Sequence, residues 1–130
     1  MRLWHESLIP HLDRQRLLGL NREVCALRGL GWGRKHSTVD WAFKYNPFRL
    51  YIYHTLVRQE MKDRGYKPGV EWGDMYYRGK RSEVWSKEEI QIERIESPIF
   101  PEHNYDYLVN EIELLKNKGI DVSTITEALL

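Results

Sequence analysis

The chain has 130 residues, a length that supports one domain with a modest core. Hydrophobic residues make up 42% and aromatic residues 12% of it, which excludes a disordered chain, and it contains no run of about 18 apolar residues that could span a membrane. The first residues lack the apolar stretch of a secretory signal, and Cys25 is the single cysteine, so we expect a soluble protein of the reducing cytoplasm.

Charge is distributed unevenly along the chain, although the formal net charge is only +1. Residues 1–81 contain sixteen Lys and Arg against eight Asp and Glu, whereas residues 82–130 contain four against eleven. Such a division is typical of a protein with a polyanion-binding face. We expect the basic part to bind the polyanion and the acidic part to limit nonspecific binding or to pack back on the basic part. Two solvated surfaces of opposite sign are the alternative.

Two helices are predicted in the basic part. Asp13 is a suitable N-cap for a helix over residues 14–28, whose apolar stripe is Leu17, Leu20, Val24 and Leu27. Asn46 followed by Pro47 is typical of a second helix start, and Gly65 is a suitable end. The expected buried side of this second helix is Phe48, Tyr51, Ile52, Thr55 and Leu56.

The acidic part is less regular. Ser86 and Glu89 form a capping box, while Ile90 and Ile92 alternate, so residues 86–96 could be helix or strand, with helix favoured. A third helix is predicted from Tyr105 to Gly119, and Thr124 with Glu127 could cap a short last turn. The sequence therefore predicts a mainly α, compact, single-domain fold with long irregular loops.

Glu23 is the first candidate for chemistry. It lies off the apolar stripe of the first helix, and its neighbours one turn away are Gly19 and Ala26, which leave open space above the carboxylate. A glycine inside a helix is unfavourable relative to alanine, so Gly19 serves either close helix packing or room for a ligand. Several arginines make this helix strongly basic, as phosphate contacts require: Arg14, Arg16, Arg22 and Arg28.

Two loops combine aromatic and basic residues. The first carries Trp32 followed by Arg34, Lys35 and His36, and the second, over residues 65–82, carries Trp72 and Arg78 among other residues of both kinds. Flexible backbone, aromatic rings and cations suit contacts with a nucleic-acid backbone, with Trp32 and Trp72 as stacking candidates. For Trp32 alone, a ring turned inward is an equally good interpretation. The five histidines are scattered without metal-ligand spacing, so we expect no metal and no cofactor.

Taken in order, several short motifs resemble the pyrimidine-dimer DNA glycosylase family, whose founding member is a phage enzyme called endonuclease V. The resemblance covers roughly residues 1–80 and the motifs keep the family's order and approximate spacing. They are Arg2-Leu3, Leu17-Leu18, Arg22-Glu23, Arg28, Arg34-Lys35-His36 and Arg64-Gly65-Tyr66. The resemblance implies that residues 1–130 form a single domain of the pyrimidine-dimer DNA glycosylase type.

The resemblance also implies a mechanism. In the family the first segment threads between helices, and the α-amino group of the chain attacks the anomeric carbon of the damaged nucleotide to form an imine. Carried over to this sequence, the α-amine of Met1 is the nucleophile and Glu23 is the acid/base group. Arg2, Arg22 and Arg28 bind the phosphates that flank the lesion.

We therefore expect a DNA repair glycosylase with abasic-site lyase activity, acting as a monomer on damaged double-stranded DNA. The alternatives are a noncatalytic nucleic-acid-binding module with the same fold, and a protein-interaction domain whose acidic end recruits a partner. Only imine chemistry leaves a covalent adduct on borohydride reduction, so that experiment separates the first hypothesis from the other two.

Overall fold

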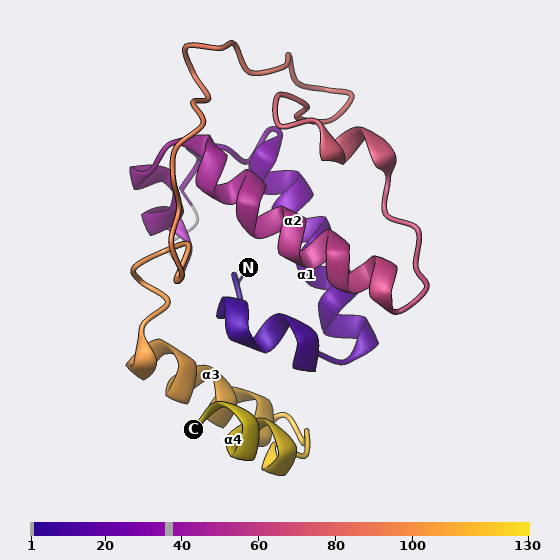
Figure 1. The fold of residues 1–130 in the computed structure, drawn as a ribbon, viewed down its shortest axis with the longest axis vertical. Helices are drawn as coiled ribbons and strands as arrows, with labels where there is room; N and C mark the ends of the chain where they lie inside the picture. The colour runs from indigo at the N-terminus through magenta and orange to yellow at the C-terminus, as the bar shows by residue number, and fades with distance from the viewer. Residues whose placement is uncertain (1, 36–37) are drawn as a thin grey trace.

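The structure, a computed structural model, describes residues 2–35 and 38–130. These residues form α-helices and short 3-10 helices with no β-strand among them, which confirms the mainly α fold. In chain order the elements are η1 (Glu6–His11), α1 (Arg14–Arg28), η2 (Asp40–Lys44), α2 (Pro47–Asp63), η3 (Val70–Gly73), α3 (Tyr105–Asn117) and α4 (Ser123–Leu129). Figure 1 shows α1 and α2 packed side by side, with α3 and α4 below them. Within the described part of the chain, no helix has the length and apolar character that a membrane crossing requires.

Helix α1 begins and ends where the sequence predicts. The Asp13 carboxylate accepts a hydrogen bond from the Arg16 amide, which satisfies one of the free amides of the first turn. The chain leaves the helix at Gly29, where a Cβ atom would lie 2.8 Å from the backbone oxygen of Arg78, too close for any larger residue. The predicted stripe is buried throughout: Leu17, Leu20, Val24 and Leu27.

Helix α2 also has the predicted bounds, and Phe48 is buried as predicted with Tyr51 and Ile52 partly buried, but the prediction was wrong for the rest of its buried side. Thr55 and Leu56 are exposed, and the face that packs on the rest of the molecule contains Leu50, Tyr53, His54, Val57, Arg58 and Met61. Two of these are polar residues with internal partners, since the His54 ring bonds to Asn21 and Arg58 donates to the Gly69 carbonyl. A hydrophobic stripe does not reveal such residues, because their burial depends on partners far along the chain.

The prediction of a regular element over residues 86–96 was also wrong. The capping box forms, with Ser86 and Glu89 exchanging backbone-to-side-chain hydrogen bonds, but the chain then turns and continues without helix or strand. Ile90 is buried against Phe48 and Trp85, whereas Ile92 is 75% exposed. Residues two apart in a strand share a face, so this pair excludes the strand as well.

The two C-terminal helices follow. Helix α3 begins after Asn104, whose side chain accepts from the Tyr107 amide, and the chain leaves it through Gly119 at φ +86°. Helix α4 begins at Ser123 after Val122, and no side chain caps its first turn. The prediction that Thr124 and Glu127 cap this helix was therefore wrong.

The acidic part packs back on the basic part. Among the described residues, three ion pairs join the two parts: Arg2 with Glu111 at 3.3 Å, Arg49 with Glu93 at 2.9 Å, and Lys44 with Glu102 at 3.9 Å. The core is shared in the same way, since Ile99, Phe100, Leu108 and Leu115 belong to one cluster with the stripe of α1. The structure therefore shows acidic residues that pack back on the basic part, which is one of the two roles predicted for them.

Candidate active site

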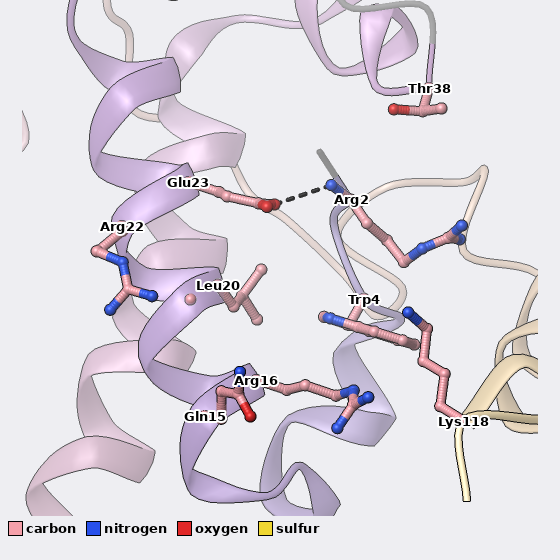
Figure 2. Close-up of a pocket in the computed structure, with 10 residues that line it drawn as sticks. Arg2, Trp4, Gln15, Arg16, Leu20, Arg22, Glu23, Thr38 and Lys118 are labelled. Atoms are coloured by element: carbon pink, nitrogen blue, oxygen red, sulfur yellow. Dashed lines mark hydrogen bonds between the residues drawn. The ribbon is translucent and has the colours of Figure 1, made fainter. Parts of the chain in front are cut away.

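The main pocket lies between α1 and the N-terminal segment, residues 2–5, and has a volume of about 510 Å³. Figure 2 shows Glu23 pointing from α1 across this pocket toward Arg2, while Arg16 extends toward Trp4 and Lys118. The lining residues are Arg2, Trp4, Gln15, Arg16, Gly19, Leu20, Arg22, Glu23, Thr38 and Lys118. Glu23 and Arg22, which the sequence singles out on the first helix, are thus at one cavity together with Arg2.

Glu23 is hydrogen-bonded to the start of the described chain. The backbone N–H of Arg2 donates to Glu23 Oε2 at 2.8 Å. Glu23 can make this contact because it lies beside the buried stripe of α1 and is itself half-buried, with its carboxylate facing the N-terminal segment. A backbone amide next to the chain's first residue is therefore held at the carboxylate that lines the pocket.

The rest of the N-terminal segment is held by side chains from other elements. The Leu3 carbonyl accepts from His103 Nε2 at 3.1 Å and from the Tyr107 hydroxyl at 2.8 Å. The Trp4 carbonyl accepts from the Tyr53 hydroxyl. Each of these backbone groups lies inside the protein without a strand or helix to pair it, so the side-chain partners both satisfy it and fix the segment in place.

The pocket is strongly cationic. Four Arg and Lys side chains and a single carboxylate line it among the described residues. Arg16 is partly neutralised by Asp13, with 3.0 Å between Nη1 and Oδ1, and Arg2 by Glu111, whereas Arg22 and Lys118 are exposed. Cations lining a concave surface raise the local concentration of a polyanion. The pocket therefore suits phosphate groups around a substrate that reaches Glu23.

Gly19 leaves open space at the pocket. A Cβ atom built on it would meet only the flexible end of the Arg22 side chain, at 3.7 Å, which is an ordinary van der Waals contact. Close packing against another helix, one of the two explanations considered for this glycine, is therefore excluded. The glycine widens the pocket beside Glu23.

Replacing Gly19 with alanine should accordingly separate stability from activity. We expect the free energy of unfolding to rise by about 0.5–1 kcal/mol, because alanine is the better helix former and nothing obstructs its methyl group. We expect the DNA cleavage predicted from the sequence to fall several-fold, because the methyl group occupies space beside Glu23. Denaturant unfolding and a strand-cleavage assay measure the two effects. Full activity in a stabilised variant would mean that the substrate does not use this space.

Arg28 is placed differently from the other predicted site arginines. It is fully buried, and its guanidinium donates to the carbonyl oxygens of Trp72, Asp74 and Tyr77 at 2.8–2.9 Å and lies 2.9 Å from His54 Nδ1. Burial lowers the pKa of Arg28 to about 10, so the group stays charged at neutral pH. All of these contacts tie α1 to α2, to η3 and to the loop after η3. Arg28 is therefore not among the proposed phosphate contacts.

The two aromatic and basic loops meet at the end of α1. Arg78 donates to the carbonyl oxygens of Arg28 and Gly29 at 2.8 and 3.0 Å, at the helix C-terminus where a cation is favourable. The Trp32 ring packs edge-on against Phe43 and Trp85, with centroids 4.9 and 5.5 Å apart. This is the inward orientation that the sequence left open for Trp32.

Trp72 is also partly enclosed. Its ring packs edge-on against Tyr77, with centroids 4.9 Å apart, and the Arg28 guanidinium lies 4.9 Å from its centroid. A second cavity of about 340 Å³ lies where the loops meet, and Trp72 and Arg78 are among its lining residues. We use the name basic loop surface for the four exposed basic side chains that the two loops carry: Arg34, Lys35, Lys80 and Arg81.

Two predicted site residues, Met1 and His36, lie outside the described residues. Sequence reasoning also missed several residues that the structure brings to the pocket. Gln15 was not predicted, and Arg16 was named only as one of the arginines that make the helix basic. Both lie one turn before Gly19, so helical spacing from Glu23 was a usable signal for them. Trp4 and Lys118 had no such signal, because they reach the pocket from segments whose position relative to α1 depends on the tertiary fold.

These features define a small helical protein with a cationic pocket built around one carboxylate. Residues 1–74, more than half of the chain, match the family described as pyrimidine dimer DNA glycosylase. The chain belongs to this family of DNA repair glycosylases, which confirms the resemblance seen in the sequence and implies DNA as the substrate. The comparisons with curated proteins and with solved structures gave no match.

Proposed function

We propose that the protein is a DNA N-glycosylase with abasic-site lyase activity, acting on pyrimidine dimers or a related lesion in duplex DNA. The observation that carries this proposal is the 2.8 Å hydrogen bond between the Arg2 amide and the Glu23 carboxylate at the cationic pocket. Within one residue, the α-nitrogen lies no more than about 4 Å from the amide nitrogen that follows it. Covalent geometry therefore keeps a free α-amine on Met1 close to the Arg2 amide that is hydrogen-bonded to Glu23 at the pocket.

The proposed reaction begins with attack of the neutral amine on C1′ of the damaged nucleotide. The bond from C1′ to the base breaks, and the base leaves with the proton that the amine loses. The nitrogen lone pair then expels the ring oxygen, which takes up a proton, and an imine joins the nitrogen to C1′. Glu23 removes a proton from C2′, the electron pair forms the C2′–C3′ double bond, and the 3′ phosphate leaves. No cofactor enters any of these steps.

The amine and the carboxylate suit these roles at neutral pH. An α-amine has a pKa of about 7.7–8.0, so a useful fraction is neutral, and nearby cations such as Arg2 increase that fraction by disfavouring the charged form. A nucleophile next to a group that accepts protons is the general arrangement of covalent catalysis.

The cations of the pocket complete the proposed site. Arg2 and Arg22 would bind the phosphates that flank the lesion, with Arg16 and Lys118 further along the same cavity. Reaching a sugar inside a duplex requires bending the DNA or flipping a nucleotide, which costs a few kcal/mol. Phosphate contacts at the cationic pocket and at the basic loop surface can offset that cost.

Borohydride trapping tests the proposed function. Protein that begins at Met1 is incubated with DNA containing one abasic site and with borohydride, which reduces an imine to a stable amine. We expect a protein–DNA adduct of one-to-one mass and, without borohydride, strand cleavage at the abasic site. Binding to the same DNA without adduct or cleavage would instead support the noncatalytic binding module.

The cationic surface predicts the salt dependence of binding. Replacing Arg22 by glutamine, or Arg34 and Lys35 together, should weaken binding to every DNA sequence tested. The slope of log affinity against log salt should fall by about one for each phosphate that the variant no longer neutralises. Arg94→Gln is the matched control, since its side chain is 88% exposed but lies in the acidic part. An unchanged slope in the Arg22 or loop variants would place those residues away from the DNA.

A further inference from the structure

Glu111 is a buried carboxylate that no part of the proposed reaction uses. It lies on α3, beyond the residues that match the family, and is only 1% exposed. Its Oε1 accepts a hydrogen bond from the His5 backbone N–H, and its Oε2 lies 3.3 Å from Arg2 Nη1. A buried carboxylate is costly unless it is paired, so both contacts matter for holding it.

Arg2 is consequently held at both of its ends. Its backbone N–H is bound by Glu23 from α1, and its guanidinium is paired with Glu111 from α3. Glu111 itself is tied through the His5 amide to the other end of the same segment. A residue fixed at its backbone nitrogen and at the tip of its side chain has little freedom to rotate, so Arg2 is held in one orientation beside Glu23.

We propose that Glu111 is a positioning residue, whose carboxylate holds Arg2 at the pocket beside Glu23. The inference rests on the proposed function for its kinetic consequence. The claim that Glu111 sets the orientation of Arg2 depends only on the contacts of Glu111 with Arg2 and His5.

Several ionisable groups surround this carboxylate. Arg2, Tyr53 and Tyr107 interact with it, the His5 amide donates to it, and the His103 ring packs against the rings of His5 and Tyr107. Burial raises the pKa of Glu111 to about 7, against the opposing effects of the His5 N–H and Arg2. The pKa values of His5 and His103 are lowered by burial, so both rings are neutral where Glu111 titrates. Protonation of Glu111 then removes the ion pair with Arg2 as pH falls through neutrality.

The kinetic test compares Glu111→Gln with wild-type protein. The glutamine oxygen can still accept from His5 but cannot pair with the Arg2 charge. With saturating abasic DNA we expect the rate of imine trapping to fall about tenfold, as misplacement of a reacting group does, while KM changes less than about twofold. The variant should also lose the part of the pH profile that titrates near 7. Glu113→Gln, an exposed position on the same helix, is the control and should match wild type.

NMR tests the role of Glu111 independently of enzymatic activity. In wild-type protein, the NMR signals of the Arg2 and His5 amides should titrate with a midpoint near pH 7, and the Glu111→Gln variant should lack this transition. If wild-type protein forms no adduct, the proposed function is contradicted. The titration of the Arg2 and His5 amides then still tests whether Glu111 holds Arg2. The positioning role is overturned if the wild-type amides do not titrate there, or if a folded Glu111→Gln variant keeps the wild-type rate and pH profile.

Discussion

Replacing Glu23 by glutamine should leave binding to abasic DNA nearly unchanged and reduce strand cleavage by about 10²–10⁴-fold, the range for loss of a general base. The amide keeps the shape of the carboxylate, and its oxygen can still accept from the Arg2 N–H at the position where Glu23 Oε2 lies. It cannot remove the C2′ proton. Equilibrium binding and single-turnover cleavage, measured on the same abasic duplex, separate the two effects.

The control for this experiment is Glu113→Gln, which removes one negative charge from an exposed position away from the pocket. Its cleavage rate should equal that of wild type, so a loss of rate in both variants would point to overall charge and not to Glu23. Wild-type cleavage by a folded Glu23→Gln variant would show that another group removes the proton.

Local signals in the sequence were enough to predict the two long helices. Asp13 before α1 and Asn46-Pro47 before α2 act on the residues next to them, and each forms the predicted cap. Glu23 was predicted as a site residue for a similar reason, since its surroundings on α1 follow from helical spacing. The structure places it at the main pocket and beside Gly19, where the sequence expected open space.

What the sequence did not predict depends on contacts between distant segments. Arg28 looks like the other arginines of α1, and only the loop that carries Trp72, Asp74 and Tyr77 makes it an internal residue. The irregular residues 86–96 likewise contact distant residues, since the Asn46 side chain accepts from the Gln91 amide and Ile90 packs against Phe48. Neither effect leaves a periodic pattern in the sequence.

The site also draws on the part of the chain that carries no family match. His103 and Tyr107 hold the Leu3 carbonyl, and Lys118 lines the pocket. Their contacts explain why residues 1–74 do not complete the site, even though Glu23 and its helix lie within the match. The acidic part of the chain thus contributes a cation to the pocket wall and the anchors for the N-terminal segment.

Extending the chain by one residue before Met1, or acetylating its α-amine, should abolish adduct formation while folding and DNA binding persist. Attack requires a neutral amine within bonding distance of C1′, and one added residue displaces the amine by about 3.5 Å. Acetylation leaves the position unchanged but removes the nucleophilic lone pair. Agreement between the two changes would therefore identify the amine itself and not the length of the chain.

Two lysines are the competing nucleophiles. Lys35 is the best placed by sequence but is exposed and does not line the main pocket, whereas Lys118 does line it. The experiment compares four proteins: wild type, the extended protein, Lys35→Ala and Lys118→Ala. Each is incubated with abasic DNA and borohydride. The products are then digested with a protease and a nuclease, and the masses of the peptides are measured. We expect the sugar remnant on the peptide that contains Met1 in wild type and in both alanine variants, and on no peptide of the extended protein. An undiminished adduct from the extended protein, absent in one of the lysine variants, would assign the nucleophile to that lysine.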